Sequence, residues 1–438
     1  MSDATAAPPV MWRPYARLLA VSALLGIVIS VAAFAFLALL HLMTHAVWEE
    51  LPHAWGFSEP PWWWPVPWLL IGGAGVGIAV RSLPGHGGHA PVQGLSMGPV
   101  PASHVPGILL GALAGLPLGA VLGPEAPLLA LGSALALIVV GPWRGSLSDP
   151  ARNVLALAGA AAAISAIFGS PVVGAVFIVE ATALAGVAGQ NLARTVLPAV
   201  LASGIGGLVF TGVGQWTGLE IASLALPGIQ GPARLDLADV LWTIPLAVVV
   251  AAAVRGVRGL GGVVARWSAP RPFVGAMVGA VAVALCASAY ALLTGRSPED
   301  VVLSGQGLLG PLAADPAAWG VGALLALLVL KGLGYAVSLG SLRGGPIFPA
   351  VLLGAAAGAL LGDLPGYGAV PALAAGMAAA TAASLPFPVS ASVLVVLLLG
   401  SAAPPLTPVV LLAATVGYVT EHYVLGPSRH AEQHAPAH

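Results

Sequence analysis

Apolar runs make up most of this 438-residue chain, and glycine or proline interrupts nearly every one of them. Only 7% of the residues are charged and 58% are hydrophobic, whereas roughly 25% are charged in a soluble globular protein. So few charges cannot cover the surface of a soluble protein of this size. The composition therefore predicts a chain that crosses the membrane several times. It excludes a disordered chain, a nucleic-acid-binding domain and a secreted disulfide scaffold.

Glycine and proline are unusually frequent, with 58 and 39 residues. Both are more common in membrane helices than in soluble ones, but a bundle of straight helices does not need so many. Non-helical backbone inside a membrane is tolerated only where it is buried in protein or lines a polar cavity. The composition thus favours an ion or solute pathway built from interrupted helices. The single cysteine, Cys286, cannot form an internal disulfide and is interpreted as core packing.

The chain divides into a short tail, one long membrane domain and a second short tail. We expect an N-terminal cytoplasmic tail at residues 1–17, a transmembrane domain at 18–425 and a C-terminal tail at 426–438. The two halves of the transmembrane domain are expected at about 18–215 and 236–425. Arg13 and Arg17 precede the first apolar run, which favours a cytoplasmic N-terminus. The Gly and Pro breaks predict about 14 to 18 helical pieces. The more polar stretches predict loops near 142–152, 214–235, 255–272 and 295–315.

The two halves share a weak internal echo. In each half a Gly/Pro-broken turn precedes an alanine-rich helix and then a second proline turn. The segments are GPEAP (123–127), LAGAAAAISAIFGSP (157–171) and VVGAVFIVE (172–180) in the first half, and RGGPIFP (343–349), LAAGMAAATAASLPFP (373–388) and VSASVLVVLLLG (389–400) in the second. Corresponding breaks in two halves indicate a repeat-built transporter with a binding site near the membrane midplane.

Glu125 is the most informative of the few ionisable residues inside apolar stretches. A charge at membrane depth is costly, and its default interpretation is a functional role. Pro124 and Pro127 flank a predicted helix start, where free backbone N–H groups bind anions. The Glu125 carboxylate can occupy such an anion site itself and leave it when protonated, which would make it a gate. A simple N-terminal cap is the alternative.

Three further charged residues lie in or at the edge of apolar stretches, namely Glu180, Lys331 and Arg343. For each of them, a buried ion pair or a polar helix contact is the alternative to a functional role. Arg343 opens a second broken helix start at 343–349, which is consistent with an anion site or with a plain loop. A third break, at 85–91, contains His86 and His89. No third ligand stands nearby, so we expect a flexible loop there and no metal.

The order and spacing of these motifs resemble the CLC family of chloride channels and proton/chloride exchangers. The segments that carry the resemblance are GPEAP (123–127), FGSPVVGAVFIVE (168–180) and LKGLGYAVSLGSLRGGPIFPAVLLG (330–354), and it covers roughly residues 18–425. The resemblance implies a homodimer with one pore per subunit. It also implies an all-α fold of about 18 helical segments in two inverted repeats, with broken helices meeting at a midplane anion site.

The resemblance also assigns candidate site residues. Glu125 matches the gating glutamate of the family's G-x-E-G-P motif, and Gly345–Pro349 matches its G-x-F-x-P element. Lys331 matches a basic residue of the same segment, with a structural role or a place in a proton path as the two readings. Backbone amides, one serine and one tyrosine hold the anion in the family. The candidate anion-binding residues here are Gly87, Ala126, Ile347, Phe348 and Tyr423.

The first two motifs depart from the family pattern. Gly87 or His86 stands where the anion-coordinating serine belongs, so backbone amides would have to compensate or the site would be weaker. Ala126 replaces the second glycine of the gating motif. Both changes leave the identity of the anion open among chloride, nitrate, fluoride and others.

The later motifs depart from it as well. Pro346 cannot donate an N–H, which leaves Ile347 and Phe348 as the expected donors. The family's late tyrosine has no counterpart in register, and Tyr418 and Tyr423 are the nearest candidates. The hydroxyl ligand of the anion therefore stays unassigned by the sequence.

The end of the FIVE segment bears on the transport mechanism. In proton-coupled members of the family, two acidic residues often end this segment, and the second relays protons from the cytoplasm. Here Glu180 matches the first and Ala181 stands at the second position. This favours channel-like conduction, with a proton/anion antiporter as the alternative and with Glu180 and Lys331 as candidates for a proton path.

We therefore expect transport of chloride or a similar small anion, with protons as a second substrate in the antiporter alternative. An intramembrane enzyme is a remote alternative, because the sequence offers no clustered acids, Ser/His dyad or metal set inside its apolar stretches. No cofactor and no nucleic acid is expected. The expected partners are membrane lipid and a second copy of the chain. The compact chain, rich in Ala, Gly and Leu, suggests a bacterial inner membrane.

Overall fold

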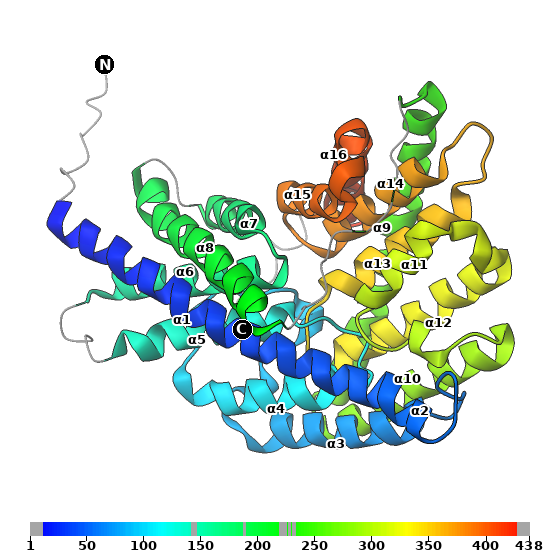
Figure 1. Cartoon of the computed structure of the whole chain (residues 1–438), viewed down its shortest axis with the longest axis horizontal. Coiled ribbons are helices and arrows are strands. Elements are labelled where there is room, and N and C mark those ends of the chain that lie inside the picture. The colour runs from blue at the N-terminus through cyan, green and yellow to red at the C-terminus, as the bar shows by residue number, and fades with distance from the viewer. Residues whose placement is uncertain are drawn as a thin grey trace, which may run out of the picture. The chain divides into compact units, whose positions relative to one another are not determined.

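The computed structural model describes residues 12–141, 147–186, 190–218, 226, 229 and 234–426 (Figure 1). Within these residues it contains sixteen α-helices and no β-strand, which confirms the predicted all-α fold. The helices of the first part are α1 (Trp12–His45), α2 (Leu51–Ala54), α3 (Pro65–Ser82), α4 (Val105–Gly115), α5 (Glu125–Val139), α6 (Asp149–Ile167), α7 (Pro171–Leu184) and α8 (Gln190–Thr217). Those of the second part are α9 (Leu237–Ser268), α10 (Pro272–Thr294), α11 (Gln306–Ala314), α12 (Gly320–Ser341), α13 (Ile347–Leu361), α14 (Ala369–Ser384), α15 (Pro388–Leu399) and α16 (Ala403–Val419).

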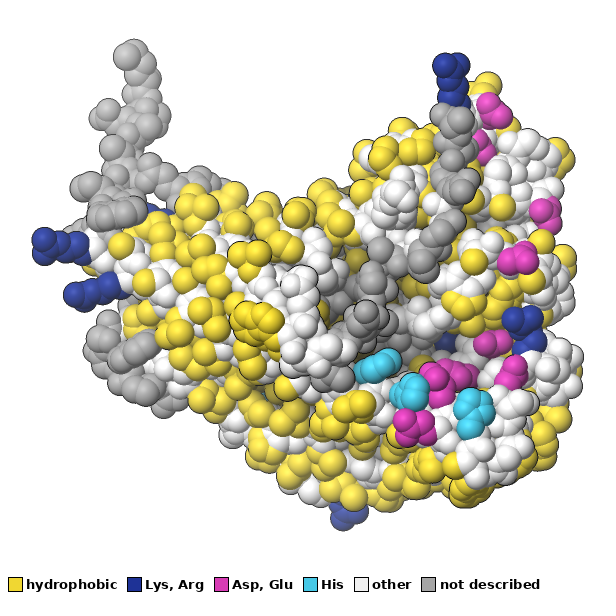
Figure 2. Space-filling model, in the orientation of Figure 1, with side chains coloured by type: hydrophobic (Ala, Val, Ile, Leu, Met, Phe, Trp, Pro, Cys, Tyr) yellow, Lys and Arg dark blue, Asp and Glu magenta, His cyan; other side chains and the backbone are white. Residues whose placement is uncertain are grey.

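The surface of the described residues suits a membrane. Eight helical segments are long and apolar enough to cross one. Large hydrophobic side chains are exposed along these segments, and Leu208 and Leu293 reach 76% and 74% exposure. Figure 2 shows hydrophobic side chains over much of the visible surface and few charged ones. Such exposure favours association or aggregation in water, but lipid tails are as apolar as these side chains. The chain is a multi-pass membrane protein.

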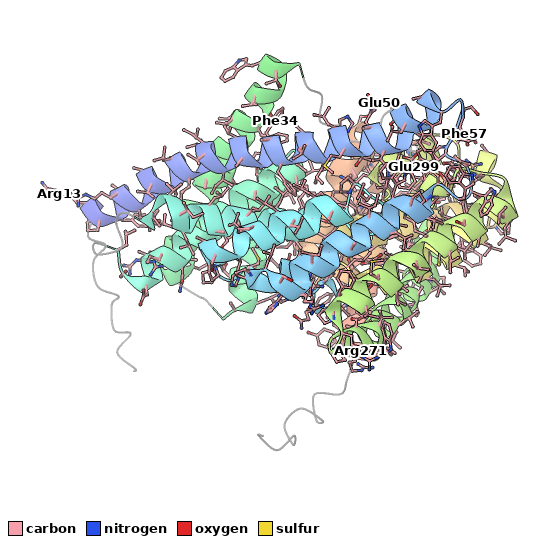
Figure 3. All side chains as sticks on the ribbon, turned by 90° about the horizontal axis from the view of Figure 1, so that it is seen from below. Arg13, Phe34, Glu50, Phe57, Arg271 and Glu299 are labelled. Atoms are coloured by element: carbon pink, nitrogen blue, oxygen red, sulfur yellow. The ribbon has the colours of Figure 1, made fainter. Side chains whose placement is uncertain are left out.

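The first helix is long and begins earlier than the sequence predicts. Arg13 lies near the start of α1, and Glu50 lies in the π-helical turn Ala46–Glu50 that follows it (Figure 3). The predicted cytoplasmic tail, residues 1–17, is therefore helical from Trp12 onward. Residues 1–11, and the predicted C-terminal tail beyond Gly426, lie outside the described residues.

Breaks at glycine and proline divide the long apolar stretches into short helices. The predicted loop at 255–272 is wrong for most of its length, because α9 continues to Ser268. Arg255 and Arg258 lie about one turn apart on this helix, and both contact the carboxylate of the buried Glu421, at 3.4 and 3.3 Å. Charges that resemble a polar loop in the sequence are therefore partners in a partly buried ion-pair group.

Contacts group the described residues into two units. Unit 1 contains the residues up to Ala38 together with Ser96–Val105 and Leu128–Ile221, and unit 2 contains Leu39–Leu95, Pro106–Pro127 and the residues from Ala222 onward. These units do not follow the predicted halves, because two segments of the first half belong to unit 2. One of these segments carries the GPEAP motif, so Glu125 packs with the second half of the chain.

Each unit contains the same close helix–helix contact. In unit 1, α5 and α6 approach so closely at Gly132 and Gly159 that a Cβ at Gly132 would overlap the Gly159 carbonyl oxygen. In unit 2, α13 and α14 meet in the same way at Gly354 and Gly376. Gly132 and Gly354 each lie seven residues after the first residue of their helix. Small residues allow membrane helices to pack backbone against backbone, and this contact repeats the internal echo of the sequence.

A candidate anion site at the start of α13

Two glycines join the broken motifs GPEAP and GGPIFP. Gly123 and Gly345 form an isolated antiparallel bridge in which each N–H donates to the other's carbonyl oxygen, and the Gly123 N–H bond is 2.8 Å long. Gly123 lies just before α5 and Gly345 just before α13, so the bridge holds the two helix starts against each other. Both glycines and both helix starts belong to unit 2.

The carboxylate of Glu125 lies on the N-terminus of α13. Its Oε1 accepts hydrogen bonds from the backbone N–H groups of Ile347 and Phe348, at 2.9 and 3.0 Å. Glu125 is only 1% exposed, although it is ionisable. The first N–H groups of a helix have no partner inside the helix and carry partial positive charge, so they bind anions. Glu125 therefore occupies the position that a small anion would take on these two amides.

The second carboxylate oxygen of Glu125, Oε2, has a different environment. Among the described residues, Oε2 is buried without a hydrogen-bond partner. A Cβ at Gly123 or at Gly345 would overlap this oxygen, so the pocket for the carboxylate exists because both residues are glycine. A buried acceptor without a donor costs free energy. Oε1 therefore accepts two hydrogen bonds, whereas Oε2 has no donor among the described residues.

The third break, residues 85–91, lies against the loop between α12 and α13. Residues Pro84–Gly87 form a short 3₁₀ turn in which His86 has φ of 50° and Gly87 has φ of 73°. Arg343 Nε donates to the His86 carbonyl oxygen at 3.0 Å, and the Arg343 side chain passes over the buried Gly87. The His86 ring nitrogen Nδ1 lies 3.0 Å from the Val80 carbonyl oxygen. Arg343 therefore links the third break, 85–91, to the loop that carries Gly345.

Lys331 is fully buried on α12 and holds a turn of backbone. Its ammonium group donates to the carbonyl oxygens of Asp300, Val301 and Val302, at 3.0, 2.9 and 3.0 Å. The next residue, Leu303, has φ of 61°, a left-handed conformation that costs free energy for a residue other than glycine. These contacts support the structural reading of Lys331, because its ammonium group donates to several carbonyl oxygens of a strained turn.

Comparison with known proteins decides the family. A family model described as voltage gated chloride channel matches residues 72–421. The chain belongs to this CLC family. Relatives include YfeO of Escherichia fergusonii, a protein whose name proposes ion transport, with 27% identity over 370 residues, 80% of this chain and 81% of the relative. YfeO of Shigella boydii serotype 4 is 28% identical over 361 residues, with the same coverage.

Solved structures show the same fold. A slow cyanobacterial Cl⁻/H⁺ antiporter matches with a TM-score of 0.73 and 16% identity over 98% of both chains. A CLC-type fluoride/proton antiporter matches with a TM-score of 0.66 and 18% identity, over 95% of this chain and 98% of that one. A eukaryotic CLC transporter matches with a TM-score of 0.69 and 17% identity, over 96% of this chain and 73% of that one. The predicted CLC-like fold is confirmed.

Three predicted site residues of this CLC protein, Ala126, Tyr423 and Glu180, lie in different surroundings. The backbone nitrogen of Ala126 would be 3.0 Å from a Cβ at Gly345, so Ala126 borders the carboxylate pocket. Tyr423 is 60% exposed, and its ring contacts that of Tyr418. Glu180 is half-buried on α7 in unit 1.

Tyr335 adjoins the candidate site of this CLC protein, and the sequence did not lead us to predict it. Its hydroxyl donates to the Pro346 carbonyl oxygen at 2.6 Å, and the residue is fully buried. Pro346 directly precedes the two residues that hold Glu125. A signal was available in the sequence, because Tyr335 follows Lys331 by four residues in an otherwise apolar helix, which places both on one face.

Proposed function

We propose that this CLC protein transports chloride or a similar small anion and that Glu125 gates the path. The observation that carries the proposal is the pair of hydrogen bonds from Ile347 and Phe348 N–H to Glu125 Oε1. A carboxylate on these amides excludes any other anion from them. The gate and the anion then compete for one binding position.

Protonation opens the gate in this proposal. A carboxylate accepts strong, charge-assisted hydrogen bonds from the two amides, whereas a neutral carboxyl accepts weaker ones. Oε2 can receive the proton without breaking an existing bond, since it has no hydrogen-bond partner among the described residues. The neutral side chain leaves, and an anion binds to the amides of Ile347 and Phe348. Anion flux then rises as the pH falls.

The coupling to protons is the second part of the proposal. We favour channel-like conduction because Ala181 stands where proton-coupled members of the family carry a second acidic residue. Antiport is the alternative, and the argument for it is the likeness in fold to two structures described as proton antiporters. In that case Glu180 is the residue we assign to the proton path. A homodimer in the bacterial inner membrane is part of either proposal.

Flux measurements on proteoliposomes test the gate. Glu125→Gln should conduct chloride at a rate that no longer depends on pH, because glutamine is neutral at every pH used. Glu50→Gln is the matched control, since it removes an exposed carboxylate from the turn after α1 and should keep the pH dependence of the wild type. A Glu125→Gln protein with the pH dependence of the wild type would remove Glu125 from the gate.

The reversal potential under a pH gradient separates channel from antiporter. A channel reverses at the chloride equilibrium potential whatever the pH gradient is. An antiporter reverses at a potential that shifts with the pH gradient, because protons carry part of the free energy. A shift that disappears in Glu180→Gln would assign the proton path to that residue.

A further inference from the structure

One peptide group connects Tyr335 to the gate. The bond between Pro346 and Ile347 has its carbonyl oxygen hydrogen-bonded to the Tyr335 hydroxyl at 2.6 Å. The N–H of the same peptide group donates to Glu125 Oε1 at 2.9 Å. Both ends of this peptide group are therefore occupied, one by the tyrosine and the other by the carboxylate.

Two physical effects follow from this chain of bonds. Hydrogen bonds in series polarise one another, so a donor on the carbonyl oxygen makes the N–H of the same peptide group a stronger donor, by about 10–30% per bond. The tyrosine also fixes the plane of the peptide group, because rotation of the planar unit would break the bond to the carbonyl oxygen. The Ile347 N–H is thereby kept pointing at the position where Glu125 now lies.

The residues around this peptide group increase the contribution of the Tyr335 hydrogen bond to anion binding. Pro346 is the residue before the first helical residue of α13, and it has no N–H of its own. Ile347 and Phe348 both donate to Glu125 Oε1, so the Ile347 peptide supplies one of these two donors. Tyr335 is fully buried, and water does not compete for its hydroxyl. A phenylalanine would fill the same space without the hydroxyl.

We propose that Tyr335 is a positioning residue that strengthens anion binding at the start of α13 by hydrogen-bonding the Pro346–Ile347 peptide group. Tyr335 acts on any anion at the two amides, whether the anion is the Glu125 carboxylate or a transported ion. The inference rests on the proposed function, because it assumes that a small anion takes the place of the carboxylate.

Chloride titration calorimetry on purified protein tests the inference. The parent protein carries Glu125→Ala, so that the carboxylate no longer occupies the amides of Ile347 and Phe348. Adding Tyr335→Phe should weaken chloride binding by about three- to tenfold. The matched control is Tyr290→Phe, since Tyr290 is also fully buried and its hydroxyl donates to Asp300 at 3.1 Å.

The control separates positioning from simple stabilisation of the fold. Each tyrosine variant loses one hydrogen bond, and Tyr290→Phe loses a bond to a carboxylate, so it should lose at least as much thermal stability as Tyr335→Phe. Only Tyr335→Phe should lose chloride affinity. Equal chloride affinity in the parent and in Tyr335→Phe overturns the inference and leaves the proposed function standing. A Glu125→Ala parent that binds no small anion overturns the proposed function and the inference together.

Discussion

Gly345→Ala should disable the proposed gate while residue 125 itself stays a glutamate. A Cβ at position 345 would overlap Oε2 of Glu125, and it would lie 3.0 Å from the Ala126 backbone nitrogen. The overlapping oxygen is the far end of a flexible side chain, so we expect the carboxylate to move rather than the backbone. Its departure breaks the two hydrogen bonds from Ile347 and Phe348.

The size of the effect follows from those two bonds. A hydrogen bond to a charged group contributes about 1.5–3 kcal/mol. Loss of one bond lowers the occupancy of the closed gate relative to the open one by about tenfold or more, because 1.4 kcal/mol corresponds to a factor of ten. Loss of both lowers it by about a hundredfold or more. At neutral pH the variant should therefore conduct chloride nearly as fast as the wild type does in acid.

Chloride efflux from proteoliposomes, measured from acidic to neutral pH, checks this expectation. Gly322→Ala is the matched control, because a Cβ at Gly322 on α12 meets no atom within 4 Å. The double variant Gly345→Ala with Glu125→Ala should behave like Glu125→Ala alone, since the methyl group acts through the carboxylate. A double variant that is blocked where Glu125→Ala conducts would show that the methyl group occludes the path, and the reasoning would be refuted.

Three further outcomes can be measured by thermal unfolding in detergent. Lys331→Met leaves several buried carbonyl groups without a donor and should cost about 3–5 kcal/mol, and an unchanged midpoint would contradict this. Burial, with help from the nearby Glu49 carboxylate, raises the pKa of Glu299 from 4.5 to about 7. Between pH 4.5 and about 7 the folded state therefore keeps a proton that the unfolded state has released. The free energy of unfolding falls by up to about 3 kcal/mol as the pH rises through that window, and Glu299→Gln should make it depend less on pH. Gly376→Val should destabilise the protein by at least about 2 kcal/mol, because a Cβ there would overlap the Gly354 carbonyl oxygen, and a wild-type midpoint would disprove this close packing.

The breaks in the helices could be predicted from the sequence because they arise from local chemistry. Pro124 lacks an N–H and lies just before the start of α5, and glycine and proline likewise mark the turns before α7 and α13. The candidate role of Glu125 was equally visible, since one carboxylate in a long apolar stretch is costly wherever it lies. Its partners were not visible in the same way.

Pairings between distant residues could not be read from the sequence alone. Glu125 and Ile347 are separated by 222 residues, and only the resemblance to the CLC family suggested that their segments meet. The hydrogen-bond acceptors of Lys331 are backbone carbonyl oxygens. Every residue has one, so no residue type in the sequence marks them. Arg255 and Arg258 indicated a loop because exposed charges usually do, whereas here they pair with Glu421 in a helical region.

Glu125 is a ligand tethered to its own receptor. A group on a short tether is present at its site at an effective concentration that can reach the millimolar range or more. Any free anion must outcompete this constant local supply, so the apparent affinity of the amides for an ion lies below their intrinsic affinity by a factor that the tether sets. In the proposed mechanism, the same competitor displaces an ion once it has bound and thereby hastens its release. The two amides would then bind an anion strongly and still let it pass, because the displacing carboxylate belongs to the protein itself.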